Sequence, residues 1–362
     1  MSANNVIQLR YELRRPDFAL DVDLELPLRG ISGVFGASGA GKTSLLRCIA
    51  GLERPERGRL LVAGELWQDS SRDTWREIHE REVGYVFQEP RLFPHLNVLE
   101  NIEYGQRRRR RSVANGLSQV VALLGLENLL QRRTSELSGG EAQRVAIARA
   151  LLCAPRFVLM DEPLASLDQA RKDEILPFLD RLHAESDIPV IYVSHNIDEV
   201  CRLCDYLVVM ENGAVAANGD LQSVLVNAEA QVLAGDQAGS VIHGTAVSYD
   251  ASDDLTCLQF SGGDLHVPGK AGADGDELRL RIRASDVSLC RVRPEQSTIL
   301  NILPARVESI RDDTGAAALV RVLLGEVSIL SRVTRRSVRE LNLREGEEVY
   351  AQIKSVAVRP SK

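Results

Sequence analysis

The stretch LSGGEAQRVAIARAL, Leu137 to Leu151, decides how the rest of the chain is interpreted. Ser138 and Glu141 have the spacing of a capping box, in which a hydroxyl and a carboxylate satisfy free N–H groups at the start of a helix. Gly139 and Gly140 lack side chains, so an anion can approach the backbone closely. The positive end of the helix dipole would point at that anion. Taken alone, the stretch fits an ordinary capped helix equally well.

A phosphate-binding loop lies upstream of this helix. Ile31–Phe35 is a short apolar run typical of a buried strand, and GASGAGKT follows it, before a helical pattern. Strand, GxxxxGK[ST] loop and helix in this order form a Walker A motif, which disfavours a glycine-rich turn without nucleotide. Lys42 can reach the outer phosphates, and Thr43 can ligate Mg²⁺. We expect ATP contacts from Gly36, Ala37, Ser38, Gly39, Ala40, Gly41, Lys42, Thr43 and Ser44.

A second buried strand, Arg156–Met160, ends in Asp161 and Glu162, as in a Walker B motif. We expect Asp161 to hold Mg²⁺, usually through water. Glu162 would polarise the attacking water, because hydrolysis needs an oriented nucleophile opposite the leaving phosphate. The alternative, two acids solvated in a turn, is disfavoured beside a Walker A motif in the same chain.

A third apolar run, Pro189–Val193, leads to Ser194 and His195. Ligands of open α/β sheets bind at the carboxyl ends of the strands, which is where this histidine falls. It could contact the γ-phosphate and hold the water and Glu162 in register. A single histidine is more often structural, but the neighbouring motifs favour the catalytic interpretation.

Together these motifs resemble the nucleotide-binding domain of an ABC transporter ATPase. The Walker A motif, VFQ with Gln88, LSGGEAQ, LMDEP, ASLD with Asp168, and His195 occur in the family's order over about residues 5–230. The resemblance implies an α/β fold with a RecA-like core, an antiparallel β flank and a helical subdomain from about Gln88 to Leu151. It also implies that two such domains sandwich two ATP molecules head to tail.

The same resemblance implies roles for the remaining motif residues. Ser138, Gly139 and Gly140 would bind the nucleotide held by the partner's Walker A motif. Gln88 would contribute to Mg²⁺ and water positioning and to coupling, and Asp168 would organise the dimer seam beside the nucleotide. Because the chain carries only one set of these motifs, the resemblance implies that it works as a homodimer or pairs with a second ATPase.

One element departs from the family pattern. An aromatic side chain usually stacks on adenine from near the N-terminus, but Leu13–Pro16 offers none. Tyr11 and Phe18 lie on either side of that segment, so the stacking residue stays open.

Composition narrows the class of protein. A chain of 362 residues is expected to hold more than one domain, and 44% hydrophobic with 26% charged residues suits globular domains. No apolar run is long enough to span a membrane, and the N-terminus lacks an apolar signal core. A net charge of −7 disfavours a nucleic-acid partner. We expect a peripheral location at the cytoplasmic face of the cell membrane.

Two local clusters have competing interpretations. The consecutive arginines Arg107 to Arg111 could contact anionic lipid or a membrane partner, but we favour a solvated connection between helices. Cys201 and Cys204 have the spacing of a redox or metal half-site, without a matching second pair. We favour buried packing for both cysteines, and free thiols fit the cytoplasm.

After about residue 230 the pattern changes to short alternating runs between Gly, Asp and Ser turns, which predicts small β-barrels. These runs are Thr256–Phe260, Leu278–Ile282, Ala305–Ile310, Ala318–Leu323 and Val349–Val358. We expect a nucleotide-binding domain at 1–232, a linker with a first β segment at 233–290, and an OB-like domain at 291–362.

The tail resembles the C-terminus of molybdate importer ATPases, in which a Mop-type (TOBE), OB-like domain follows the ATPase. The segments that carry the resemblance are IRASDVSL (Ile282–Leu289), STILNILPARV (Ser297–Val307) and VYAQIKSVAV (Val349–Val358).

Stand-alone Mop proteins bind molybdate through a Ser-Ala-Arg-Asn and an Ile-Lys-Ser segment. Thr298 and Asn301 align with the first, without its Ala-Arg pair, and Lys354 and Ser355 align with the second. A tetrahedral dianion needs several N–H and O–H donors with one or two cations. The resemblance therefore implies a candidate oxyanion site, and a dimerising or regulatory barrel without an anion is the alternative.

These observations predict the ATPase subunit of a molybdate importer that uses ATP and Mg²⁺. Its expected partners are a second copy of itself, integral-membrane permease subunits contacted near Glu89–Leu99, and indirectly an extracytoplasmic molybdate-binding protein. One alternative is an importer for tungstate or sulfate. Another is a soluble ABC ATPase acting on DNA or ribosomes, although such proteins carry a coiled-coil insertion or two motif sets.

Overall fold

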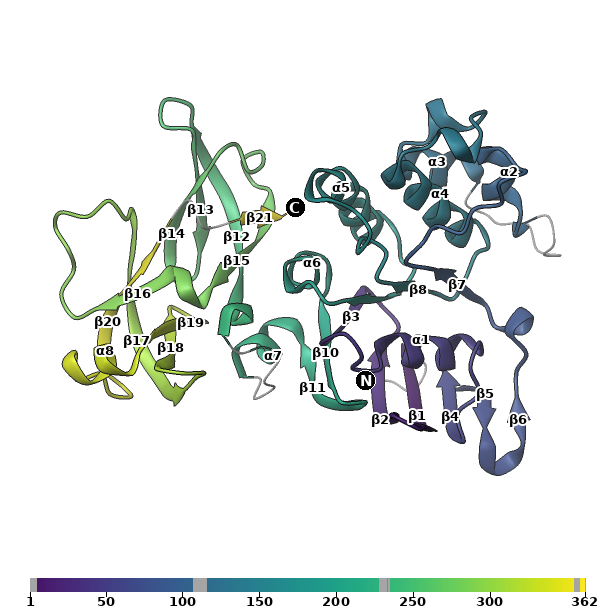
Figure 1. Cartoon of the computed structure of the whole chain (residues 1–362). Helices are drawn as coiled ribbons and strands as arrows, with labels where there is room; N and C mark the ends of the chain where they lie inside the picture. The colour runs from purple at the N-terminus through teal and green to yellow at the C-terminus, as the bar shows by residue number, and fades with distance from the viewer. Residues whose placement is uncertain (1–4, 107–115, 228–232, 234, 355–358, 362) are drawn as a thin grey trace. The chain divides into compact units, whose positions relative to one another are not determined.

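The computed structural model describes residues 5–106, 116–227, 233, 235–354 and 359–361. The chain divides into two compact units, Met1–Asn218 and Gly219–Lys362 (Figure 1). The domain limits expected at residues 232 and 290 stay predictions. None of the helices in the described ranges is both long and apolar enough to span a bilayer.

The centre of the first unit is a parallel sheet. In sheet order its strands are β10 (Tyr206–Glu211), β3 (Ile31–Phe35), β9 (Val190–Ser194), β8 (Phe157–Asp161) and β7 (Val83–Val86). Every residue of β3, β8 and β9 is buried. Parallel strands covered on both faces read as unbroken apolar runs, which is why these three could be predicted to within a residue.

An antiparallel flank extends the same sheet, as expected from the resemblance. Its strands are β6 (Thr74–Trp75), β5 (Glu65–Asp69), β4 (Arg57–Val62), β1 (Val6–Arg15) and β2 (Phe18–Pro27), followed by β11 (Ala214–Asp220) next to β10. Buried and exposed residues alternate along β1 and β2, so the flank buries one face against the core.

Helices complete the first unit. Three belong to the nucleotide-binding core: α1 (Lys42–Ala50), α5 (Gln169–Glu185) and α6 (Ile197–Leu203). Three form the helical subdomain, gathered beyond β7 and β8 in Figure 1: α2 (Val98–Glu103), α3 (Leu117–Leu124) and α4 (Gly139–Leu152).

The capping box at the start of α4 is present. Ser138 Oγ accepts from the Glu141 N–H at 3.2 Å, and the Glu141 carboxylate accepts from the Ser138 N–H at 2.7 Å. That backbone hydrogen bond lowers the pKa of Glu141. The first helix residue is therefore the one that the sequence pattern predicted.

The second unit is an all-β domain with a few short helices, in agreement with the prediction. One sheet contains β14 (Gly263–Pro268), β13 (Leu255–Phe260), β12 (Gly239–Asp250), β15 (Glu277–Arg283) and β21 (Arg359–Ser361). The other contains β16 (Val287–Cys290), β20 (Glu348–Ile353), β17 (Asn301–Asp312), β18 (Ala317–Leu324) and β19 (Val327–Thr334). The unit also has α7 (Leu221–Asn227) and α8 (Arg335–Glu340).

One hydrophobic core joins these two sheets. Ile242 and Leu280 of the first sheet belong to the same buried cluster as Val320 and Ile353 of the second. The predicted runs fall on β13, β15, β17, β18 and β20, whereas β12, β14, β16 and β19 were not anticipated.

A buried guanidinium fastens the phosphate-loop helix to the flank. Arg81 is 2% exposed and donates to the carbonyl oxygens of Cys48 and Ile49, at 3.0 and 2.7 Å, in the last turn of α1. Its group also lies 4.6 Å from the ring centroid of Trp75. A cation at a helix C-terminus satisfies free carbonyls and complements the dipole.

We predict that Arg81→Met lowers the free energy of unfolding by on the order of 3 kcal/mol, because the Cys48 and Ile49 carbonyls lose the hydrogen bonds from the buried guanidinium. Urea denaturation followed by tryptophan fluorescence measures this, since both tryptophans of the chain, Trp67 and Trp75, lie in the flank. Arg54→Met is the matched control, because Arg54 also lies over Trp75 but is largely exposed. Equal losses in the two variants would contradict the role given to Arg81.

Candidate functional site

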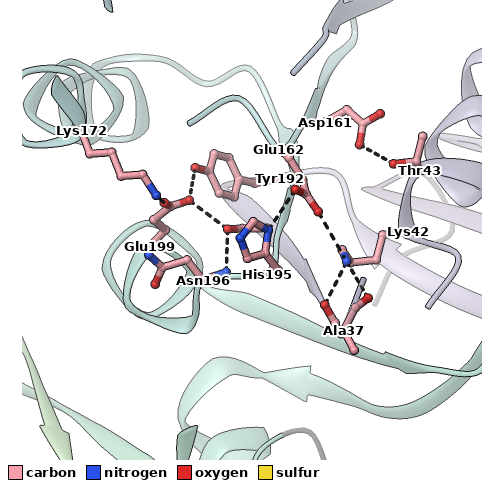
Figure 2. Close-up of polar contacts among 12 residues, drawn as sticks. Ala37, Lys42, Thr43, Asp161, Glu162, Lys172, Tyr192, His195, Asn196 and Glu199 are labelled. Carbon is pink, nitrogen blue, oxygen red and sulfur yellow. Dashed lines mark hydrogen bonds and ion pairs between the residues drawn. The ribbon is translucent and has the colours of Figure 1, made fainter. Parts of the chain in front are cut away.

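The predicted motif residues meet at the carboxyl edge of the parallel sheet. Lys42 follows β3, Asp161 and Glu162 end β8, and His195 follows β9, and these three strands are direct neighbours. Figure 2 shows Glu162 directed to Lys42 and His195, with Asp161 directed to Thr43 beside them. The order of strands in the sheet thus assembles groups that are far apart in the sequence.

The ammonium of Lys42 is the most enclosed charge of this site. It is 4% exposed and donates to the carbonyl oxygens of Gly36 and Ala37, both at 2.9 Å. Its Nζ also lies 3.5 Å from Glu162 Oε1. A buried cation needs such compensation, and a phosphate can provide it in place of the carboxylate.

The loop around Lys42 requires glycine at two positions. Gly41 has φ of 97°, in the left-handed region, and a Cβ there would lie 2.7 Å from the ring of Phe18. A Cβ at Gly36 would lie 2.4 Å from the carbonyl oxygen of Met210. The loop can therefore curl around an anion only with these residues.

Thr43 and Asp161 form a pair of oxygen ligands. Thr43 Oγ1 donates to Asp161 Oδ1 at 2.9 Å, and the hydroxyl of Tyr85 donates to Asp161 Oδ2, also at 2.9 Å. Burial and the neighbouring Asp161 raise the pKa of Tyr85, so its hydroxyl stays protonated. Hydroxyl and carboxylate oxygens suit Mg²⁺, and the residues present therefore fit this ion.

Glu162 and His195 form the second pair. His195 Nδ1 and Glu162 Oε2 are 2.9 Å apart, and Figure 2 shows the carboxylate between His195 and Lys42. Glu162 has φ of 46°, an unusual backbone conformation for a residue other than glycine, and its N–H donates to the Val193 carbonyl at 3.1 Å. Such strain is typical of functional sites. The pair can orient a water molecule beside a bound γ-phosphate.

Ser138, Gly139 and Gly140 lie at the start of α4. Ser138 is exposed, and a Cβ at Gly139 would lie 3.1 Å from the side chain of Leu167. Asp168 caps α5 by accepting from the Arg171 N–H at 3.0 Å. No hydrogen bond or ion pair within the described ranges joins these residues to Lys42, Asp161 or Glu162. The start of α4 is thus separate from the group of residues around Lys42.

Gln88 is exposed just beyond β7, in a segment that α4 holds from two points. Gln143 Nε2 donates to the Phe87 carbonyl at 3.3 Å. The guanidinium of Arg149 donates to the carbonyls of Pro90 and Arg91, at 3.0 and 2.9 Å. These contacts were not anticipated, because their acceptors are backbone atoms that carry no signal in the sequence.

The two aromatic candidates for adenine stacking differ in burial. Tyr11 is fully buried in the core of the flank. Phe18 is only partly buried and its ring lies against the phosphate loop at Gly41. The structure thus leaves Phe18 as the aromatic residue next to the loop.

In the tail, Asn301 is 1% exposed and clamps two strands. Its Oδ1 accepts from the His266 N–H at 2.7 Å, and its Nδ2 donates to the His266 carbonyl at 3.0 Å. Thr298 and Lys354 are exposed, whereas Ser355 lies outside the described residues. The oxyanion site stays a prediction.

Of the two other clusters singled out in the sequence, the structure describes only the cysteines. Arg107 to Arg111 lie outside the described residues. Cys201 and Cys204 are buried, and Cys204 packs against Gly33 of β3, which agrees with the packing interpretation.

The Walker A motif after β3, the Walker B motif at the end of β8, His195 and the capped signature helix define an ABC-type ATPase. The family model described as ABC transporter matches residues 20–165, and the TOBE domain model matches residues 297–360. The molybdenum import ATP-binding protein ModC of Methylococcus capsulatus is 50% identical over 353 residues, 97% of this chain and 99% of that protein. The corresponding protein of Pseudomonas aeruginosa is 49% identical over 358 residues, with 97% and 99% coverage. The chain belongs to the family of molybdenum import ATP-binding proteins.

A solved structure agrees with the fold of the ATPase part. The cbiO1 protein of Clostridium perfringens, part of an ABC transporter complex, superposes with a TM-score of 0.54 and 26% sequence identity. The match covers 62% of this chain and 92% of that one. The predicted α/β ABC ATPase fold with a C-terminal TOBE-type β domain is confirmed.

We predict that Glu162→Gln lowers the rate of ATP hydrolysis by about 10²-fold or more, because the amide cannot accept a proton from the attacking water. Nucleotide binding should persist, since Lys42 and the loop are untouched. Phosphate release measures the first effect, and gel filtration with ATP measures a trapped dimer. Unchanged turnover would remove Glu162 as the group that orients water.

Proposed function

We propose that this chain is the ATP-hydrolysing subunit that powers import of molybdate through a separate membrane permease. The observation that carries the proposal is the Glu162 carboxylate, held between Lys42 and His195 at the edge of the sheet. Similarity to molybdenum import ATP-binding proteins over nearly the whole chain supports molybdate as the cargo.

In this proposal the chain's own residues bind and orient the reactants. The loop from Gly36 to Ser44 wraps the phosphates, and Lys42 exchanges the Glu162 carboxylate for the outer phosphates. Thr43, Asp161 and Gln88 would hold Mg²⁺, which neutralises charge on the β- and γ-phosphates. Glu162 accepts a hydrogen bond from the attacking water, and His195 keeps the carboxylate and the γ-phosphate in register.

The adenine base stacks on Phe18 in this scheme. The partly buried ring beside Gly41 supports this assignment, and the complete burial of Tyr11 argues against the other candidate. Affinity then combines ring stacking with phosphate contacts.

A second copy of the chain completes each ATP site. The exposed Ser138 at the positive end of α4 supports this arrangement, because the start of a helix favours the binding of an anion. Asp168 would lie at the seam between the copies. ATP draws the two copies together, and hydrolysis releases them.

When two copies close around ATP, the movement is passed to the permease through Glu89–Leu99. The guanidinium of Arg149 in α4 holds this segment. The permease would receive molybdate from an extracytoplasmic binding protein, and this subunit would sit peripherally on the cytoplasmic face of the membrane. Tungstate and sulfate are the alternative cargoes.

Uptake of molybdate, tungstate and sulfate by cells with and without this chain tests the proposal. We expect that deletion abolishes molybdate uptake, that the unchanged chain restores it, and that Lys42→Ala fails to do so at equal expression. Restoration of sulfate uptake alone would overturn the cargo. A lack of response from all three anions would overturn the transport role and leave the ATPase assignment standing.

We predict that mixed dimers of Ser138→Arg with Lys42→Ala retain at most one working composite site. One variant lacks the signature donor and the other lacks the phosphate cation, so head-to-tail pairing places both defects in the same site and leaves the other intact. Phosphate release by purified mixed dimers, compared with each homodimer, measures this. Homodimers of either variant should be inactive, and a mixed dimer as inactive as the homodimers would contradict head-to-tail pairing.

A further inference from the structure

A buried carboxylate lies directly behind the site. Glu199, in the first turn of α6, is 4% exposed and accepts hydrogen bonds at both oxygens (Figure 2). Lys172 Nζ donates to Oε1 at 2.8 Å. The hydroxyls of Tyr192 and Ser194 donate to Oε2 at 2.9 and 2.8 Å. Burial and the adjacent carboxylate raise the pKa of Tyr192 well above its usual value, so its hydroxyl stays a donor.

Hydrogen bonds that start from this carboxylate hold Ser194 and Asn196, the residues before and after His195. Ser194 has a single hydroxyl proton, which it donates to Glu199. The hydroxyl oxygen of Ser194 can therefore only accept in its other hydrogen bonds. The N–H of Asn196 donates to that oxygen at 3.0 Å. The turn that carries His195 is thus held by a hydrogen-bond chain that ends on Glu199.

Lys172 connects the Glu199 carboxylate to Asp168, the residue expected at the seam between two copies. It lies in the first turn of α5, whose N-cap is Asp168, and its N–H donates to the Asp168 carbonyl at 3.0 Å. The Lys172 side chain is 14% exposed, so the ion pair is largely shielded from water. Shielded, fully satisfied polar networks define one geometry more strictly than surface pairs do.

We propose that Glu199 is a positioning residue that holds His195 at the distance of its hydrogen bond to Glu162, and that Lys172 ties this geometry to Asp168. The proposal rests on the ATPase function proposed above. Through this network, the start of α5 and the histidine turn form one unit, so the seam between two copies and the hydrolytic residues share a fixed geometry.

The test is ATP hydrolysis by the full-length chain with Glu199→Gln. This change keeps the size of the side chain and removes the ion pair with Lys172. We expect kcat to fall by about 10- to 100-fold, the scale at which small misplacements of reacting groups act. The KM for ATP should stay within about twofold, because Lys42 and the loop are not contacted by Glu199. Lys172→Met, which leaves the carboxylate in place, should lower kcat in the same direction.

A matched control exists on the same two helices. Asp180 of α5 pairs with Arg202 of α6, Oδ2 to Nη2 at 2.6 Å. Asp180→Asn therefore removes a comparable pair between α5 and α6. We expect a kcat within about twofold of the unchanged protein, since the hydrogen bonds between these two side chains join α5 to α6 without involving Glu199.

The distinguishing measurement is made in a His195→Ala background. If Glu199 acts through His195, Glu199→Gln adds no further loss to the residual rate, whereas general destabilisation lowers both backgrounds equally. An unchanged kcat in Glu199→Gln, or an equal loss in both backgrounds, would overturn the inference. An unchanged protein that does not hydrolyse ATP would instead overturn the proposed function, so the two failures are distinguishable.

Discussion

The buried ammonium of Lys42 is the interaction on which the rest of the structure depends. At 4% exposure it needs compensation from two loop carbonyls and from Glu162. The carbonyls can converge only on a loop with glycine at the curled positions. The carboxylate is available because β3 and β8 lie on either side of β9 in the sheet. The sequence of the loop and the order of strands in the sheet thus both serve to compensate the buried charge of Lys42. A phosphate that replaces Glu162 beside this ammonium frees the carboxylate for water.

A single rigid helix, α4, links the proposed half-site at its start to the segment around Gln88. Its capped N-terminus faces outward at Ser138, while Gln143 and Arg149 hold the backbone between Phe87 and Arg91. If ATP binding displaces the N-terminus of α4, as the proposed function requires, these hydrogen bonds would transmit the displacement to that segment. The proposed coupling would then act through a packed helix and its contacts.

Continuous apolar runs made the site predictable, since each of β3, β8 and β9 is a buried strand ended by a motif residue. The tail was harder to predict, because β12 has no regular alternation: its first four residues are all buried, and Gly244 interrupts it. The contacts of Tyr85 and Glu199 could not be predicted either. Their partners lie on other strands and helices, and a buried tyrosine or glutamate has no local pattern that reveals its hydrogen-bond partners.

Asn301 shows why matching a motif and binding its ligand are separate questions. Both polar atoms of its amide engage the backbone of His266, so its role in this chain is to join β17 to β14. An oxyanion in the tail would then depend on exposed groups such as Thr298 and Lys354, with less desolvation and weaker binding per contact. Hydrolysis at the sheet edge requires no contact with the cargo. Similarity along the full chain, including residues 219–362, is therefore what separates this ATPase from others that share the site.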